Sequence, residues 1–335
     1  MLKCIKCSNE IFFNISNKYY ECNTCVNKYN TINDIIITDT SIDTQLNVND
    51  YINEKADDRP IVNFIEFIKN LYNDRGKLSA LEIASGPGNL TCQLLENDVI
   101  NELWSSDISV DFLKYQQKNI TNPICKFIQF NASNTFPFKD NSLDLVYGNS
   151  CLHHFVDYDK TLIECFRILK PGGIAIFGEP ISTGIQPYFL MLTLVAEFDK
   201  REKIPMFTSN IYNRIKQFNI DNSMLLELAK TKNLVELNKY EDKYQYTIDH
   251  LLNLSKQIGF SDFTTIKDIN KESFIYKPSI ETYIQQVELY INSVLNNWKL
   301  PDKYKWIIEL VYNTIVKPNL GESYCALFTV FCMKK

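Results

Sequence analysis

The chain has 335 residues, of which 45% are hydrophobic and 22% are charged, and its formal net charge at pH 7 is -5. The length exceeds one average domain, so we expect a core domain with one or two additions. The acidic balance argues against a protein whose affinity comes mainly from phosphate contacts, because such proteins need a basic surface. Only a local basic patch would allow nucleic-acid binding.

Targeting signals and cysteine usage point to a reducing compartment. The first residues, Met1 to Cys4, lack the apolar stretch of a secretory signal, so we expect a cytoplasmic location. The longest apolar run, Pro187 to Phe198, is shorter than the ~20 residues that a membrane span needs, and it predicts a buried helix. The ten cysteines are therefore better interpreted as thiols or metal ligands than as disulfides.

Two short-spaced cysteine pairs open the chain. Cys4 and Cys7 form the first pair, Cys22 and Cys25 the second, and fourteen residues separate the pairs. Two residues between the members of each pair let both sulfur atoms face one ion, and four thiolates suit tetrahedral zinc. The alternative is four ordinary buried cysteines. It is disfavoured because the first ~30 residues hold too little apolar mass for a core without a metal.

We therefore predict a zinc ribbon over residues 1–38. Residues 20–25 and 29–38 also resemble the zinc-ribbon modules that are fused or bound to methyltransferases, where the ribbon is usually structural or recognitional. Residues 39–58 are polar and aperiodic, which predicts a linker, and a second domain is expected over residues 59–335. Its first element is an amphipathic helix, predicted from apolar residues at helical spacing. These residues are Ile61, Phe64, Ile65, Ile68 and Leu71.

The stretch from Leu81 to Thr91 predicts a strand, a tight turn and a helix. The turn holds Gly86, Pro87 and Gly88, and Asn89 opens the helix. Glycine permits a positive φ and lets a ligand lie directly against the backbone. A nucleotide-like ligand is the first hypothesis, although Gly-x-Gly is also found in plain structural turns.

Polar residues follow the next predicted strands at the end where a parallel sheet binds its ligand. Asp107 follows the strand over 102–106, about twenty residues after the glycine turn, where a carboxylate can accept from both ribose hydroxyls. A helix cap is the alternative role for this side chain. Asn131 follows the strand over 126–130, and Asn149 follows the strand after it. The sequence therefore predicts a crevice at this edge.

Five ordered segments resemble the motifs of class I S-adenosylmethionine (SAM) dependent methyltransferases, in particular those of methyltransferase type 11. The segments are Leu81–Thr91, Asp107–Ser109, Phe136–Val146, Leu152–His154 and Arg167–Gly173. The resemblance covers residues 77–180 well and returns near 248–268. It implies an α/β fold, a Rossmann-like doubly wound seven-stranded sheet, here with a small N-terminal zinc ribbon and helical cap insertions.

The resemblance also implies the cofactor and the residues that hold it. SAM would lie against the glycine turn, with Glu82 orienting the loop or the methionine amino group. Asn131 stands where the family often has Asp, so it keeps an acceptor for the adenine amino group but loses the charge. Ala84 stands where the family commonly has Gly, which should narrow the space between strand and helix without abolishing binding. The predicted cofactor residues are Glu82, Ala84, Gly86, Gly88, Asp107, Ile108, Asn131, Ala132 and Asn149.

Three residues are candidates for acid–base work. His153 and His154 could act as a general base because imidazole titrates near neutral pH, although in the family such a pair often only packs and hydrogen-bonds. Glu179 follows the predicted strand over 174–178 and could orient or deprotonate a substrate. The alternative for Glu179 is a solvent-exposed loop carboxylate.

Two insertions, at about 181–247 and 278–317, depart from the minimal fold. Both emerge at the ligand end of the sheet, so we expect them to form a cap over the acceptor. Their many aromatic residues indicate an apolar or ring-containing acceptor, although core packing explains the same residues. No membrane span is expected, and the sequence leaves the oligomeric state open.

Three functions compete. The leading one is a SAM-dependent enzyme that methylates oxygen, nitrogen or carbon of a small-molecule or lipid-like acceptor. The second is an RNA methyltransferase, because a cysteine ribbon before this fold resembles the bacterial ribosomal guanine methyltransferases; the acidic balance opposes it, so nucleic acid is not expected as a partner. The third is a SAM-binding scaffold that has lost catalysis.

Overall fold

The computed structural model describes residues 1–39, 76–265, 280–294, 300–320 and 328–335, with residues 48, 68, 69 and 72. The chain divides into two compact units. The first comprises Met1–Gly178, Leu252–Thr264 and Val330–Lys335, and the second comprises Glu179–Leu251 and Thr265–Thr329. The linker predicted over 39–58 and the helix predicted over 61–71 lie almost wholly outside the described residues.

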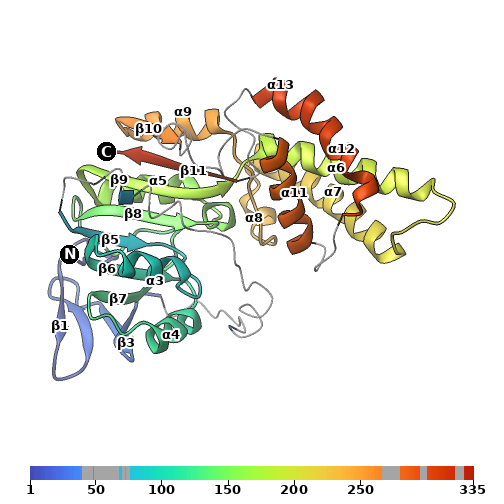
Figure 1. Ribbon diagram of the computed structural model, residues 1–335. Coiled ribbons are helices and arrows are strands. Elements are labelled where there is room, and N and C mark those ends of the chain that lie inside the picture. The colour runs from blue at the N-terminus through green and yellow to red at the C-terminus, as the bar shows by residue number, and fades with distance from the viewer. Residues whose placement is uncertain are drawn as a thin grey trace. The chain divides into compact units, whose positions relative to one another are not determined.

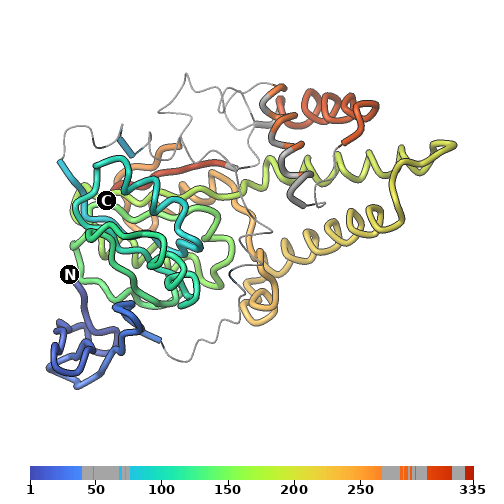
Figure 2. Tube along the Cα trace, turned by 60° about the horizontal axis from the view of Figure 1, so that its bottom comes forward, coloured from blue at the N-terminus to red at the C-terminus, as the bar shows by residue number. Residues whose placement is uncertain are grey.

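The first unit is built on one mixed sheet (Figure 1). Figure 2 shows the course of the chain from a second direction. The strand order is β1-β2-β3-β4-β7-β6-β5-β8-β9-β11-β10. The strands after the N-terminal segment are β5 (Leu78–Glu82), β6 (Ile100–Asp107), β7 (Cys125–Gln129), β8 (Leu143–Asn149), β9 (Leu169–Pro180), β10 (Asp262–Thr265) and β11 (Phe328–Lys334). Neighbouring strands from β7 to β9 pair in parallel. The described residues therefore form a Rossmann-like α/β fold.

The strand order reverses between β5 and β8, and such a reversal is where a doubly wound sheet is expected to bind a ligand. Helix α3 (Asn89–Glu96) connects β5 to β6, α4 (Val110–Asn119) connects β6 to β7, and α5 (Tyr158–Ile168) connects β8 to β9. Because such crossovers are right-handed, α3 and α4 cover one face and α5 the other. Helix α9 (Ile248–Ile258) precedes β10. Ligands of doubly wound sheets bind where the order reverses, at the carboxyl ends of the strands.

Strand β9 is irregular near its start. Residues 170–173, which follow α5 closely in the chain, lie within this strand. The register pairs Leu143 with Leu169 and then Leu145 with Ile174, so these four residues oppose Asp144 alone. The result is a bulge, in which the ladder continues on either side of the extra residues.

The N-terminal segment extends the same sheet, which therefore has eleven strands and not the seven predicted. Its strands are β1 (Ile11–Asn14), β2 (Tyr19–Cys22), β3 (Lys28–Ile32) and β4 (Ile35–Ile37). β4 pairs in parallel with β7, with Ile36 opposite Ile128 and Ile37 opposite Gln129. All three isoleucines of β4 are buried. A strand that is apolar on both faces needs other elements packed against those faces, and α4 (Val110–Asn119) packs against β4.

A second attachment joins the chain's first residues to segment 136–138. The Lys3 amide donates to the Pro137 carbonyl at 3.0 Å, and Leu2 forms an antiparallel bridge with Phe138. From the other side, the Arg167 guanidinium donates to the Phe136 and Phe138 carbonyls at 3.1 and 2.8 Å. Both phenylalanines are completely buried. The segment is thus held between the N-terminus and α5.

The second unit is helical. Its helices are α6 (Ser182–Lys200), α7 (Ser209–Lys230), α8 (Leu234–Leu237), α11 (Ile280–Val294), α12 (Lys305–Val311) and α13 (Lys317–Leu320). Helices α6 and α7 lie side by side and antiparallel (Figures 1 and 2). Tyr188 and Tyr283 are fully buried in the hydrophobic core of this unit, so core packing explains these two aromatics. Among the described helices, none is both long and apolar enough to cross a membrane.

A buried carboxylate ties the second unit together. Asp199, near the end of α6, is fully buried and accepts four hydrogen bonds. The donors are the amides of Met206 and Phe207 at 3.0 and 2.9 Å and the hydroxyls of Tyr212 and Tyr304, both at 2.5 Å. Burial alone would raise the pKa of Asp199, but the four donors together lower it to about 2. One side chain thus connects α6 to the following loop, to α7 and to the 3-10 turn Asp302–Tyr304.

We expect Asp199→Asn to lower the free energy of unfolding of the second unit by about 2 kcal/mol at pH 7, because the depressed pKa reflects stabilisation of the ionised form. This contribution is present above the unfolded pKa near 4 and is lost as pH falls towards 2. Urea unfolding of both proteins between pH 7 and 2.5 measures it. A difference that stays constant over this range would contradict the assignment.

Candidate cofactor and metal sites

The glycine turn has the shape that its sequence predicts. Gly86 and Gly88 have φ values of +53° and +87°, and Gly88 is the left-handed residue before α3. A Cβ on Gly88 would lie 2.7 Å from the Gln116 side chain, whereas a Cβ on Gly86 would meet nothing within 4 Å. Position 88 therefore requires glycine by conformation and by space, whereas position 86 favours glycine by conformation alone.

Ala84, just before the turn, also has a positive φ of 49°. The predicted consequence of alanine at this position is a narrower space between strand and helix. The structure adds a backbone cost, because a left-handed conformation brings an L-residue's Cβ close to the following carbonyl oxygen.

A buried carboxyl group lies beneath the turn. Glu82 is 3% exposed, and its Oε2 accepts from the Thr91 hydroxyl at 2.5 Å and from the Tyr147 hydroxyl at 2.9 Å. Burial raises the pKa of Glu82 to about 8, although both hydroxyls act to lower it. Glu82 ends β5, Thr91 belongs to α3 and Tyr147 belongs to β8. Glu82 therefore links the helix after the turn, and the neighbouring strand, to the strand before the turn.

Gln116 holds the turn from the other side, and no feature of the sequence singles it out. The side chain is fully buried, and its Nε2 donates to the Ser85 hydroxyl and to the Gly86 carbonyl, both at 2.7 Å. Its Oε1 accepts from the Ser105 hydroxyl at 2.7 Å. A lone glutamine on an amphipathic helix has no local pattern that separates it from a surface residue.

Asp107 ends β6 and fastens the turn directly. Its Oδ2 accepts from the Gly86 amide at 2.9 Å, and its Oδ1 accepts from the Ser109 amide at 2.8 Å. Burial raises the pKa of Asp107 to about 6, partly offset by these amides. Each carboxylate oxygen has a second lone pair, so both can still accept from a ligand's hydroxyls. The predicted alternative role as a helix cap is wrong for Asp107, because the cap residue of α4 is Ser109 and, among the described residues, no side chain makes a capping hydrogen bond there.

The other predicted cofactor residues follow the same strands. Ala84, Ile108, Asn131 and Asn149 are all partly exposed, and they lie at or just beyond the carboxyl ends of β5, β6, β7 and β8. The Asn131 Oδ1 accepts from the Ser133 amide at 2.9 Å, which leaves one lone pair for a ligand. Ala132 is buried, and its carbonyl accepts from the Thr161 hydroxyl at 2.8 Å.

The three acid–base candidates have different surroundings. His153 and His154 lie on the 3-10 turn Leu152–His154 after β8, with ring centroids 4.0 Å apart. His153 is buried and His154 is partly exposed. Glu179 is completely buried and lies within β9, so the predicted alternative of an exposed loop carboxylate is wrong.

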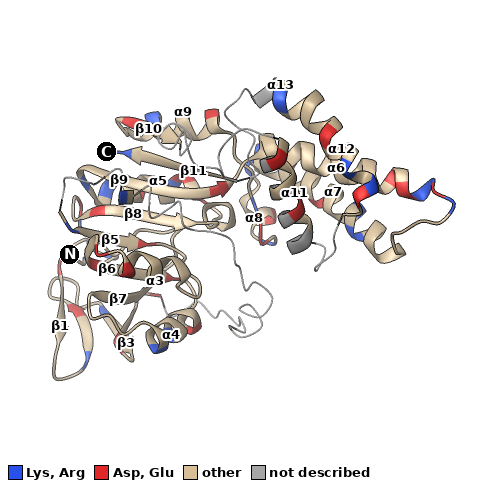
Figure 3. Ribbon diagram, viewed as in Figure 1, with Lys and Arg blue, Asp and Glu red and all other residues tan. Residues whose placement is uncertain are grey.

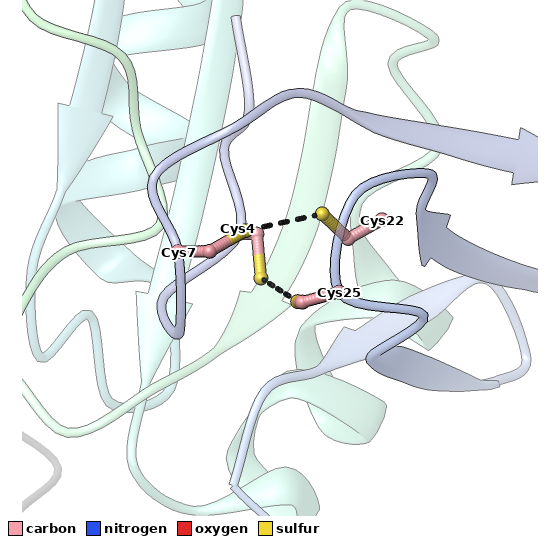
Figure 4. A group of neighbouring side chains, drawn as sticks. All are labelled: Cys4, Cys7, Cys22 and Cys25. Atoms are coloured by element: carbon pink, nitrogen blue, oxygen red, sulfur yellow. Dashed lines mark hydrogen bonds between the residues drawn. The ribbon is translucent and has the colours of Figure 1, made fainter.

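The four N-terminal cysteines meet at one point (Figure 4). The Sγ atoms of Cys4 and Cys25 are 3.5 Å apart, those of Cys7 and Cys22 are 3.3 Å apart, and all four lie within 4.8 Å of one another. Tetrahedral zinc with Zn–S bonds of ~2.3 Å places its sulfur ligands ~3.8 Å apart. The four thiols are free, not joined as disulfides, so the donor set fits such an ion.

Both cysteine pairs are folded in the same way. The Ser8 amide donates to the Cys4 carbonyl and the Val26 amide to the Cys22 carbonyl, each at 2.8 Å. Ser8 and Val26, each next after the second cysteine, both have positive φ values. The Tyr29 hydroxyl donates to the Cys4 sulfur at 3.0 Å. Such donors hold a thiolate in place and orient it towards a metal.

Comparison with known proteins gives a partial match. Residues 81–177 match the family model of a methyltransferase domain. A ubiquinone/menaquinone biosynthesis C-methyltransferase from Francisella tularensis subsp. tularensis (strain FSC 198) is 32% identical over 113 residues, which are 31% of this chain and 44% of the relative. The corresponding enzyme of Pseudoalteromonas translucida (strain TAC 125) is 33% identical over 99 residues, covering 28% and 39%. The chain thus spans less than half the length of these curated relatives.

Solved structures give weaker likenesses over more of the chain. A chain from the complex between the Haloferax volcanii Trm112 methyltransferase activator and a methyltransferase has a TM-score of 0.47 and 13% identity, over 87% of this chain and 99% of that chain. The phosphoethanolamine N-methyltransferase 2 of Haemonchus contortus, bound to phosphomonomethylethanolamine and S-adenosylhomocysteine, has a TM-score of 0.47 and 14% identity, over 87% and 59%.

We expect Ala84→Gly to raise the free energy of unfolding by up to about 1 kcal/mol, because relief of the left-handed strain exceeds the entropy cost of glycine. Ala80→Gly is the matched control, since Ala80 is a buried residue of β5 and should only lose stability. Urea unfolding measures both. If the two variants lose stability equally, Ala84 carries no backbone strain.

Proposed function

We propose that the chain is a SAM-dependent methyltransferase that acts on a small-molecule acceptor. The observation that carries this proposal is the match of residues 81–177 to a methyltransferase domain, together with the glycine turn that Asp107 fastens inside that segment. The first curated relatives are named as C-methyltransferases, which supports a small acceptor. Because the alignment covers less than half of each relative, the accepting atom stays open among oxygen, nitrogen and carbon.

Bound SAM would supply an electrophilic methyl group, which would pass from its sulfonium sulfur to the acceptor and leave S-adenosylhomocysteine. The protein would contribute mainly by holding the acceptor atom close to the methyl group and in line with the bond that breaks. Asp107 would accept from the ribose hydroxyls with its remaining lone pairs, and Asn131 would accept from the adenine amino group. Both bonds of Glu82 from described residues go to Oε2, so in the ionised form of this carboxyl group its Oε1 would be the oxygen that accepts from the methionine amino group.

The roles of the remaining site residues stay predictions. A base is needed only when the nucleophile carries a proton, and His153, His154 and Glu179 are the candidates. The segments at about 181–247 and 278–317 keep the proposed role of a cap, with an apolar or aromatic acceptor. A cytoplasmic location also remains a prediction.

An RNA acceptor is less well supported. Lysine and arginine are interspersed with aspartate and glutamate along the described elements of each unit (Figure 3), whereas phosphate binding calls for a basic face. The N-terminal ribbon is part of the sheet through β4, which favours a structural role for it over a mobile reading module. Retention on heparin at moderate salt would favour RNA.

We also propose that Cys4, Cys7, Cys22 and Cys25 bind one zinc ion. The distances between the sulfur atoms and the hydrogen bonds to Cys4 support this assignment. The ion would stabilise the ribbon, because a segment with so little apolar mass gains most of its folding free energy from the metal. With four protein ligands the site would be closed, as in structural zinc sites.

Calorimetric titration with S-adenosylhomocysteine tests the cofactor site. We expect the intact protein to bind and Asp107→Ala to bind at least about tenfold more weakly, because it loses charge-assisted hydrogen bonds. Affinity of the intact protein should also fall as pH drops through about 6, where Asp107 becomes protonated. Asp111→Ala is the control, since this exposed carboxylate in the first turn of α4 contacts Lys114. Equal binding by both variants would remove Asp107 from the site.

Native mass spectrometry tests the metal site. We expect one zinc per chain, lost in Cys7→Ser because a hydroxyl does not replace a thiolate ligand. Cys92→Ser is the control, since Cys92 is a free cysteine of α3 outside the cluster. Retention of zinc by the Cys7→Ser protein would show that the ion is bound elsewhere.

A further inference from the structure

One side chain lies between the N-terminal ribbon and the proposed cofactor site. Gln129 is the last residue of β7 and is completely buried. In the sheet it stands opposite Ile37 of β4 on one side and opposite Asp107 of β6 on the other. It therefore borders both the final strand of the ribbon and the strand that carries the proposed ribose ligand.

On the ribbon side, Gln129 is bound by the two residues that follow β4. Its Oε1 accepts from the Thr38 and Asp39 amides at 3.2 and 3.1 Å. Its backbone carbonyl accepts from the Thr38 hydroxyl at 2.8 Å and from the Thr38 amide at 3.2 Å. Four donor–acceptor contacts thus fix Gln129 to the end of the ribbon.

On the side facing β6, the side-chain amide of Gln129 contacts the residue that follows Asp107. Gln129 Nε2 donates to the Ile108 carbonyl at 3.3 Å. Ile108 directly follows Asp107, which in turn accepts from the Gly86 amide at 2.9 Å. A continuous series of contacts therefore runs from Thr38 through Gln129 and Ile108 to the glycine turn.

We propose that Gln129 is a positioning residue, through which the metal-loaded ribbon holds the Asp107–Ile108 edge in its cofactor-binding conformation. This inference rests on the proposed function, since it concerns the same cofactor site. β4 has only three residues, so its place in the sheet depends on the fold of the ribbon that precedes it. If β4 leaves the sheet, Thr38 and Asp39 move with it, and the Gln129 Oε1 loses both amide donors. An unpaired buried amide is costly, so the Gln129 side chain would rotate towards other hydrogen-bond partners. Its bond to Ile108 would then be lost as well.

A purely structural role for the ribbon makes a different prediction. If β4 only covers apolar surface, loosening it would lower the free energy of unfolding and leave the affinity of the folded protein unchanged. Binding affinity, measured where every variant is folded and zinc-loaded, separates the two roles.

The first test changes the ribbon side only. We expect Thr38→Val, which removes one hydroxyl donor but keeps the shape, to weaken S-adenosylhomocysteine binding about three- to tenfold. Thr38→Ser keeps a hydroxyl and should restore the affinity. Thr31→Val is the matched control, because the Thr31 hydroxyl donates to the Lys18 carbonyl at 2.7 Å within the ribbon. Equal affinities for the Thr38→Val and Thr31→Val proteins would overturn the proposal.

The second test removes the metal with a chelator. Binding of S-adenosylhomocysteine should weaken at least about tenfold, and amide hydrogen exchange over residues 105–110 should accelerate in cofactor-free protein. In Gln129→Met the link is already broken, so chelation should lower the affinity of this protein by a further factor of less than about two. A metal-free protein that binds with undiminished affinity would overturn the coupling alone. Absence of binding to the intact, zinc-loaded protein would overturn the proposed function itself.

Discussion

The hydrogen bond from the Gly86 amide to the buried Asp107 carboxylate is the contact on which the site depends. A tight turn exposes backbone groups that its own residues cannot satisfy, and these groups need partners from elsewhere. Here the Gly86 amide donates to the Asp107 carboxylate, and the Gly86 carbonyl accepts from the Gln116 side-chain amide. Because those partners come from β6 and α4, the turn keeps its shape only when the sheet and its helices are assembled.

The same carboxylate is held in a state suited to binding. Burial raises the pKa of Asp107 to about 6, yet two backbone amides favour its ionised form. Near neutral pH the group is therefore charged, buried and fixed in orientation. A ligand hydroxyl that donates to it would meet an acceptor that needs no rearrangement, which is the general advantage of a preorganised site.

The ribbon and the sheet form one structure and not two domains in sequence. β4 adds to the edge of β7, and residues 2–3 join segment 136–138. Because β4 and β7 share backbone hydrogen bonds, the N-terminal segment and the rest of the sheet stabilise each other. The edge strand β7, which would otherwise expose unpaired backbone groups, is thereby covered. Residues near the start of the chain thus cover the edge of a strand that begins at Cys125.

The helical unit follows a comparable principle with different chemistry. The unit consists of one segment that ends at Leu251 and one that begins at Thr265, and the two share a hydrophobic core. Asp199 accepts hydrogen bonds from both segments, for example from the Phe207 amide and the Tyr304 hydroxyl. A buried carboxylate is tolerated there because two amides and two hydroxyls donate to it. Two insertions that are far apart in sequence therefore behave as one packed body.

The sequence by itself determined the elements whose signal is local. The strand, glycine turn and helix at 81–91 follow from apolar runs and from residues that permit a positive φ, and the paired cysteines follow from spacing. Asp107 could be chosen because a residue after a parallel strand lies at the ligand edge, and Asn131 because the family resemblance points to that position. Those patterns need only a few neighbours along the chain.

Tertiary structure alone decided which distant groups complete the site. Gln116 and Gln129 are ordinary polar residues in the sequence, and they matter because folding brings their amides to Gly86 and Ile108. The union of β4 with β7 joins residues about ninety positions apart, and three isoleucines do not specify which strand they will pair with. A hydrogen bond between distant residues leaves no periodic pattern in the sequence, so only the assembled sheet reveals it.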